Sequence, residues 1–209
     1  MFMTDHVIEK LSNSKYSSAI IKQIVNLHMK AFSGFFLTFL GPGFLFHLYS
    51  GFCRHTDSEI IVIKTQQDII VGFAAYTSNL RDLYIYLLKH SIIPLAYYSF
   101  CAAIKKPSSI YRLFRSLYRP KEAVRASKYI ELSSICVDPN VESSGLGSLM
   151  LKTIQENFDI TKFDYIKLDT DAENNDAVNR FYMKNGFILH SQHSTPEGRI
   201  MNEYRWNNI

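Results

Sequence analysis

The sequence has few cysteines, glycines and prolines for its length, and these shortages exclude several classes of protein. It has 209 residues with 9 Gly and 6 Pro, and 47% of its residues are apolar while 20% are charged. This composition excludes a disordered chain, a collagen-like repeat and low-complexity linkers. We therefore expect one domain of ordinary size, residues 1–209, with a buried core.

The cysteines exclude two further kinds of site. Cys53, Cys101 and Cys136 are odd in number and lack the close paired spacing of a zinc site or a redox dithiol. They lie in apolar stretches, so we expect reduced core thiols and no metal. The first thirty residues lack a basic start, an apolar run and a cleavage site, so no export signal is visible. Both observations predict a cytoplasmic protein.

Positive charge is concentrated in one part of the chain. Residues 81–128 carry ten Lys and Arg and two acidic residues, although the formal net charge of the whole chain is only +4. Within this block, the sequence predicts a basic amphipathic helix over 108–119, with arginines on one face and apolar side chains on the other. The apolar set is Ile110, Leu113, Phe114, Leu117 and Tyr118. Residues 83–104 are apolar and helical in pattern, but Lys89, His90 and Pro94 interrupt a membrane span.

Apolar periodicity and turn residues predict alternating helices and strands over most of the chain. The predicted helices cover 18–32, 145–158 and 175–185. A further helix is predicted to begin at Phe44, after a loop that contains Gly41-Pro42-Gly43. The predicted strands cover 59–64, 69–77, 129–137, 164–171, 187–194 and 199–206. This order predicts an α/β domain with a mixed sheet.

The most informative segment is VDPNVESSGLG at 137–147, a strand followed by a turn of small residues and a helix. Gly145 and Gly147 allow close approach of the backbone, and the N–H groups of the turn and first helical turn favour an anion such as pyrophosphate. A tight turn also requires glycine for purely steric reasons, so the motif alone has two interpretations. The residues that follow Gly147 do not match a P-loop or a dinucleotide-binding fingerprint.

A second motif follows at a fixed distance. VDPxxxxxGLG is followed by a helix, a strand and NxxxxxxYxxxGF, which runs from Asn175 through Tyr182 to Gly186-Phe187. In this combination the chain resembles the GNAT superfamily of acyl-CoA-dependent N-acyltransferases. The resemblance implies a mixed, mostly antiparallel sheet flanked by helices, with a helical insertion between the third and fourth strands. It also implies acetyl-CoA as cosubstrate and transfer of its acetyl group to a primary amine by direct attack.

The resemblance also implies which residues contact acetyl-CoA. These are Ile135, Cys136, Val137, Ser143, Ser144, Gly145, Leu146, Gly147, Ser148 and Asn175. For Asn175, a helix N-cap is an equally good interpretation. Glu142 departs from the family, which usually has Arg or Gln at this position, and its charge would repel phosphates unless it turns toward solvent.

For catalysis, the resemblance implies that Tyr182 is the acid for the leaving thiolate and Glu131 the base for the amine. Each has a structural alternative: Tyr182 could pack in the core, and Glu131 could be a salt-bridged strand residue. Asp169 and Asp171 are substitute bases. A backbone N–H near Cys136 or Val137 is the expected oxyanion donor, while the Cys136 thiol is not expected to be a nucleophile.

The acceptor is predicted from the parts outside these motifs. Residues 81–128 and the FFLTFLGP segment resemble GNAT proteins encoded with bacterial surface-polysaccharide synthesis, which implies an amino-sugar acceptor. The phenylalanines between 32 and 46 suggest an acceptor pocket or a homodimer contact, with core packing as the default. An alternative function is a GNAT-fold protein that binds acyl-CoA or a partner as a regulator without turnover.

The basic helix predicted over 108–119 has its own expected partner. Its segregated arginines suggest peripheral contact with an anionic membrane at the inner face, or with a phosphate-bearing substrate. A helix packed on the domain with its arginines in water is the alternative. A nucleic-acid partner is not expected, because the basic block has no interleaved aromatic platform and no groove-reading motif.

Overall fold

The fold is seen in a computed structural model that describes residues 6–11, 16–105, 128–141, 145–195 and 198–207. The strands are β1 (Val7–Leu11), β2 (Ser58–Lys64), β3 (Ile70–Thr77), β4 (Tyr129–Val137), β5 (Tyr165–Asp171), β6 (Ile188–Ser194) and β7 (Ile200–Trp206). The helices are α1 (Ser18–Ala31), α2 (Phe36–Phe39), α3 (Pro42–Arg54), α4 (Leu80–Lys105), α6 (Leu146–Glu156) and α7 (Asp176–Lys184). The helix predicted over 108–119 lies outside the described residues.

The strands form one seven-stranded sheet in the order β1-β2-β3-β4-β5-β7-β6. Only β4 and β5 pair in parallel, and every other neighbouring pair is antiparallel. Helix α4 lies between the third and fourth strands in the chain. The predicted fold class is therefore confirmed.

Three features of the N-terminal part differ from the sequence-based expectation. Strand β1 was not predicted, and α2 lies in what was expected to be a loop. Helix α3 begins at Pro42 rather than at Phe44. Gly41 precedes it at φ 88°, a conformation that glycine adopts easily, and proline is favoured at the first helical position because its fixed φ suits a helix.

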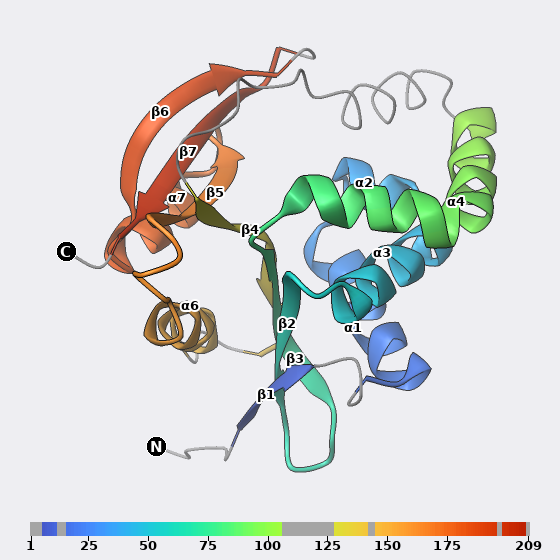
Figure 1. The fold of residues 1–209 in the computed structure, drawn as a ribbon, viewed down its shortest axis with the longest axis horizontal. Helices are drawn as coiled ribbons and strands as arrows, with labels where there is room; N and C mark the ends of the chain where they lie inside the picture. Colours follow the sequence, from blue (N-terminus) through green and yellow to red (C-terminus); the bar gives the residue numbers. More distant parts are fainter. Residues whose placement is uncertain (1–5, 12–15, 106–127, 142–144, 196–197, 208–209) are drawn as a thin grey trace.

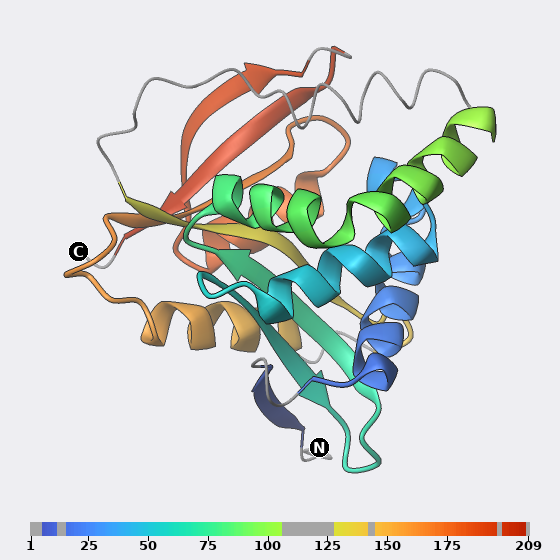
Figure 2. The same ribbon diagram turned by 45° about the vertical axis from the view of Figure 1, so that its right-hand side comes forward.

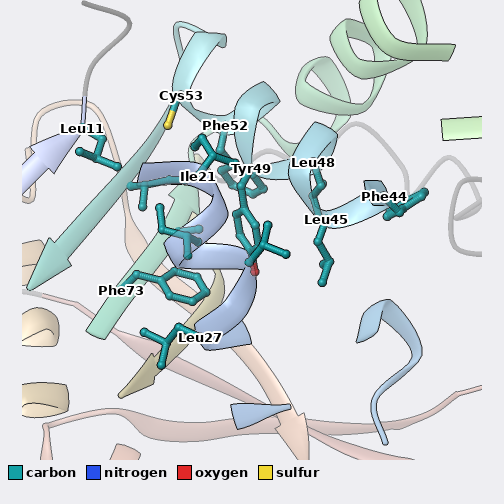
Figure 3. Packing of buried hydrophobic residues seen from close by; sticks show 14 of the residues in the cluster. Leu11, Ile21, Leu27, Phe44, Leu45, Leu48, Tyr49, Phe52, Cys53 and Phe73 are labelled. Atoms are coloured by element: carbon teal, nitrogen blue, oxygen red, sulfur yellow. The ribbon is translucent and has the colours of Figure 1, made fainter. Parts of the chain in front are cut away.

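The helices cover the two faces of the sheet with separate cores. Figures 1 and 2 show α1, α3 and α4 on one face and α6 on the other. The first core joins α1, α3 and α4 to β2 and β3, and Figure 3 shows side chains of α1, α3 and the sheet gathered around Tyr49. The second core packs α6 and Tyr182 of α7 against the other face. All three cysteines are free thiols, but only Cys53 is fully buried.

Strands β4 and β5 are paired only at one end. Their parallel register covers Tyr129 to Glu131 on β4 and Tyr165 to Lys167 on β5. From there β4 pairs only with β3, and a register shift leaves Ser133 as an extra residue opposite Ala75 and Tyr76. Such a bulge bends a strand and leaves backbone groups without a ladder partner. The two strands therefore diverge toward the end of β4.

Helix α4 has a packed and an exposed side in its second half. Ser91 has non-helical angles (φ −140°, ψ 20°) three residues before Pro94, whose ring disrupts the preceding helical turn. Beyond this break, Leu95, Tyr98 and Ala102 pack on the first core. The opposite side carries four exposed apolar side chains, here called the outer stripe, which are Ile93, Tyr97, Phe100 and Ile104.

Among the described residues, α4 alone is long and apolar enough to cross a membrane by length and composition. Only 17% of its most apolar window is buried within the protein. In its first half, however, Leu83 and Leu87 belong to the first core, so this part is held against α3 and the sheet.

The two sides of α4 should respond differently to truncation. Leu83→Ala removes a side chain that is 0% exposed, so we expect the free energy of unfolding in urea to fall by about 2–5 kcal/mol. Ile93→Ala on the same helix removes a side chain that is 80% exposed, and should change it by less than about 0.5 kcal/mol. Similar losses in both variants would contradict this packing of α4.

Candidate functional site

A cavity of about 600 Å³ opens where β4 ends, between the N-terminus of α6 and one side of α7. This volume is typical of a small-molecule site. Its lining comprises Ile135, Cys136, Val137, Asp138, Pro139, Val141, Gly145, Leu146, Gly147, Ser148, Val178, Phe181, Tyr182 and Lys184. Seven of the ten predicted cofactor contacts are brought together here. Ser143, Ser144 and the unusual Glu142 lie outside the described residues, and Asn175 is not part of the lining.

The N-terminus of α6 supplies backbone donors to this cavity. Gly145 precedes the helix at φ 74°, and the N–H of Leu149 donates to the Gly145 carbonyl at 2.9 Å. The amides of the residues before Leu149 belong to the first turn, whose N–H groups have no acceptor within a regular helix. These amides carry the partial positive charge of the helix end, so the site favours an anion.

Gly147 is needed for space as well as for close approach. A Cβ at this position would lie 3.1 Å from Cζ and 3.3 Å from Cε2 of Phe181 on α7. Because both residues line the cavity, the missing side chain keeps α6 and the Phe181 ring close together without filling the hollow. Gly145 has no atom within 4 Å of such a Cβ, so its requirement is conformational.

Cationic side chains stand on the α7 side of the cavity. Lys184 is part of its lining, and a neighbouring hollow shares Lys184 and adds Arg180. On the opposite rim, Asp138 accepts hydrogen bonds from Asn140 and lies 3.4 Å from the Lys30 ammonium. The hydrogen bond from the Asn140 backbone N–H lowers the pKa of Asp138, and Lys30 adds to this effect.

Tyr182 is buried and also borders the cavity. Its ring packs against Phe181, Phe187 and Tyr204, so both the catalytic and the core interpretation of this residue have a structural basis. Among the described residues its hydroxyl has no hydrogen-bond partner. Burial raises the pKa of Tyr182, so the phenol keeps its proton at neutral pH.

Asn175 precedes α7 but does not cap it through its side chain. Its Nδ2 donates to Thr170 Oγ1 at 2.8 Å and to the Asp171 carbonyl at 3.2 Å, which ties the start of α7 to the end of β5. Asn179, one turn later, donates to the same Asp171 carbonyl. Its Oδ1 accepts hydrogen bonds from Asn202 and Tyr204.

The anchoring role of Asn179 was not predicted from the sequence. Its position three residues before Tyr182 places it on the same side of α7, and its side chain is buried within polar partners on β5 and β7. The only signal in the sequence is a polar residue at a helical position that otherwise points inward. This anchor ties the helix that carries Tyr182 to β5 and β7.

Glu131 lies outside the cavity lining, at the last parallel pair between β4 and β5. It is half-buried, and its register partner is Lys167, a lysine that is only 3% exposed. Burial opposes the charge of Lys167, but Asp169, Glu131 and Glu203 together raise its pKa. The setting of Glu131 is thus a cluster of charged side chains, which fits its alternative interpretation as a salt-bridged strand residue.

The two substitute bases differ in how their oxygens are used. Asp171 forms a bidentate pair with Arg199, and the Arg199 guanidinium lies 6.0 Å from the centre of the Phe35 ring. Asp169 reaches Lys167 at 3.4 Å through Oδ2, while its buried Oδ1 has no hydrogen-bond partner. Asp169 lies two residues beyond the last β4–β5 pair, where the strands diverge.

Cys136 is held in its unreactive form. Burial raises the pKa of its thiol, and the charge of Asp138 acts in the same direction. A protonated thiol is a poor nucleophile. Within the described ranges there is also no group of three or more His, Cys, Asp or Glu side chains that could hold a metal ion.

A buried polar chain that the sequence did not indicate reaches the bulge of β4. His28 Nδ1 on α1 shares a 2.7 Å hydrogen bond with the Tyr49 hydroxyl on α3, which donates to Ser134 Oγ at 3.4 Å. Ser134 directly follows the extra residue of the bulge. His28 Nε2 is buried without a partner, and burial lowers the pKa of His28 to about 4.

Comparison with known proteins identifies the family. A family model described as the acetyltransferase (GNAT) family matches residues 21–187. The chain belongs to this family. The match confirms the predicted resemblance and the expected class of activity, an acetyl-CoA-dependent N-acetyltransferase. No curated protein matches the chain significantly by sequence.

Several solved structures share the GNAT fold of this chain. They include an N-acetyltransferase from Staphylococcus aureus Mu50, with 13% identity, a TM-score of 0.59 and coverage of 97% of this chain and 98% of that one. The ribosomal-protein-S18-alanine N-acetyltransferase from Escherichia coli has 14% identity, a TM-score of 0.56 and coverage of 97% and 93%. Arabidopsis thaliana NAA60 in complex with acetyl-CoA has 10% identity, a TM-score of 0.59 and coverage of 97% and 99%.

Because His28 stays neutral in the folded protein, acid should destabilise it. The unfolded chain takes up a proton below pH 6.5 and the folded chain only near pH 4, so stability is lost as pH falls through this window. From pH 7 to pH 5 we expect the free energy of unfolding to fall by about 2 kcal/mol on account of His28.

Urea unfolding at a series of pH values measures this loss. His28→Gln should be less stable at pH 7, because the bond to Tyr49 is altered, and should show a flatter pH profile. His190→Gln, at an exposed position on β6, is the matched control and should keep the profile of the original chain. If the free energy of unfolding of His28→Gln falls with pH as steeply as that of the original chain, a group other than His28 causes the loss.

Proposed function

We propose that the cavity at the end of β4 binds acetyl-CoA and that the protein transfers the acetyl group to the primary amine of a small molecule by direct attack. The observation that carries this proposal is the open cavity of about 600 Å³ at the N-terminus of α6, lined by the motif residues Gly145, Leu146, Gly147 and Ser148. A thioester supplies the activated acyl group. The residues of the chain bind acetyl-CoA, orient the amine and protonate the leaving thiolate.

The residues present suit each part of acetyl-CoA. The first-turn amides of α6 and the lysine at 184 suit a pyrophosphate, since both present positive charge to the same hollow. Beyond the bulge, the edge of β4 that faces away from β3 suits an amide-bearing arm, which can add to it as a short strand would. Neither contact depends on the side chain at Glu142.

Tyr182 is the proposed acid that protonates the leaving thiolate. It shares the cavity wall with Cys136 and Gly147, and its phenol is protonated at neutral pH. A protonated phenol without a competing partner can donate its hydrogen to a developing anion. Backbone N–H groups of the diverging part of β4 near Cys136 are the proposed oxyanion donors.

The amine is proposed to enter on the other face of the sheet, where Glu131 and Asp169 flank the point of divergence. These two carboxylates attract an ammonium, and either can accept its proton, so that the amine attacks in its neutral form. Asp169 Oδ1 has no hydrogen-bond partner among the described residues, whereas Asp171 is occupied by Arg199. Phe35, close to Arg199, would border the acceptor from the α1–α2 side.

For the acceptor we propose an amino sugar of a surface-polysaccharide precursor. One support is the resemblance of residues 81–128 and the FFLTFLGP segment to GNAT proteins encoded with surface-polysaccharide synthesis. The other is the set of side chains near the point where β4 and β5 diverge. There the carboxylates suit an amine, Arg199 suits hydroxyls and the Phe35 ring suits the face of a sugar. Mass spectrometry after incubation with acetyl-CoA and a panel of amino sugars, polyamines and peptides tests this class directly.

Binding of the cosubstrate is tested without turnover by calorimetry with CoA. Gly147→Val adds bulk against the Phe181 ring inside the cavity, so we expect the Kd for CoA to rise by about tenfold or more, ~1.4 kcal/mol in binding free energy. Lys152→Val introduces the same residue on the solvent side of α6 and should leave the Kd unchanged. Equal Kd values in the two variants would refute the location of the site.

Tyr182→Phe separates catalysis from binding. Loss of the proton donor should lower turnover by about 10²- to 10⁴-fold, while the Kd for CoA stays within about twofold. Tyr16→Phe, which removes a hydroxyl bonded to Arg54 at the start of α1, is the control and should retain turnover. If Tyr182→Phe has the same turnover as the original chain, this residue is not the acid. CoA binding without turnover on any amine would favour the alternative function, a GNAT-fold protein that acts as a regulator.

A further inference from the structure

We propose that the outer stripe of α4 is the surface by which this protein lies on an anionic lipid bilayer, with the second half of the helix in the plane of the membrane interface. The stripe was defined above as Ile93, Tyr97, Phe100 and Ile104. The proposal is independent of the acetyl-transfer chemistry, because it concerns a surface outside the cavity and its test measures lipid binding.

The stripe is unusually apolar for a surface that faces water. Its four side chains are 80%, 62%, 63% and 69% exposed, in chain order. They follow a spacing of four, three and four residues, so they form one row about 17 Å long on a helix. No charged residue occurs from Ile92 to Ile104. A helix that lies on a protein surface in water normally carries charge on that side, and a continuous apolar row marks an interaction surface.

The other side of the same helix packs on the core, so the orientation of the outer stripe relative to the domain is fixed. The Tyr98 ring lies so close to Gly43 of α3 that a Cβ there would be 2.1 Å from Cζ. Leu95 and Ala102 continue this packed side. In Figures 1 and 2 the second half of α4 lies at the outer edge of the molecule. The helix can therefore present one side to a membrane while its other side stays on the core.

The charges around the stripe select the occupant. Lys89 precedes it and Lys105 follows it, and both are exposed. The chain that continues from Lys105, residues 106–127, carries six Lys and Arg and one Glu, a net charge of +5. An apolar row next to basic residues matches an anionic bilayer, which attracts the cations and accepts the apolar side chains. A second copy of this chain would instead bring two basic blocks together, which like-charge repulsion disfavours.

The test is co-flotation of the full chain with vesicles of phosphatidylcholine alone or of phosphatidylcholine containing phosphatidylglycerol. We expect binding to the phosphatidylglycerol vesicles, weakened by added salt, and little binding to phosphatidylcholine alone. The combined variant Ile93→Ser, Phe100→Ser and Ile104→Ser should need at least about tenfold more lipid for half binding. Ile160→Ser with Ile188→Ser, at side chains 64% and 69% exposed elsewhere, is the matched control and should bind normally.

Each other outcome overturns the proposal and names a different occupant. Flotation that is absent, or equal with both lipids, excludes an anionic bilayer. A concentration-dependent dimer in light scattering that the triple variant abolishes, without lipid binding, assigns the stripe to a second copy. A melting temperature in buffer that falls more in the triple variant than in the control assigns the stripe to packing within this protein. Binding that survives in the triple variant but is lost on replacing Arg112, Arg115 and Arg119 by Glu places the contact in the basic segment instead.

Discussion

The divergence of β4 from β5 is the constraint on which the rest of this structure depends. Two parallel strands that pair for three residues and then separate leave a gap in the middle of a continuous sheet. An unpaired strand edge needs hydrogen-bond partners, which another strand, side chains, water or a ligand with amide groups can supply. The cavity, the helix terminus beside it and the proposed catalytic side chains Tyr182 and Glu131 all lie on β4 or beside it.

Two independent polar systems hold the gap open from opposite faces of the sheet. On the α1 side, His28 and Tyr49 reach Ser134 next to the bulge, so the bend of β4 is tied to the helical layer. On the α7 side, Asn175 and Asn179 tie the helix that carries Tyr182 to the end of β5. Both systems therefore connect an element that borders the gap to the rest of the fold, and hydrogen bonding within each system compensates its buried polar groups.

The sequence was most informative where the spacing of neighbouring residues along the chain determines the structure. Strand β4 and helices α6 and α7 were predicted nearly to the residue, because alternating or helical apolar spacing and glycine at 145 leave few other conformations. Seven of the ten predicted cofactor contacts line one cavity for the same reason. By contrast, β1, the pairing of His28 with Tyr49 and the cluster around Lys167 join residues far apart in the chain, and no local spacing encodes such contacts.

The same reasoning explains why the apolar character of residues 83–104 was ambiguous in the sequence. A break at Ser91 and the proline at 94 mean that the helix does not keep one inward face along its length, so its apolar residues serve two purposes. In the first half they complete a core with α3, as Leu83 does. In the second half Leu95, Tyr98 and Ala102 pack on the first core, whereas the four side chains of the outer stripe belong to neither core and are exposed. The composition of residues 83–104 does not distinguish the two sets of apolar side chains. Their positions do, because one set packs on α3 and the sheet and the other is exposed and forms the proposed membrane surface.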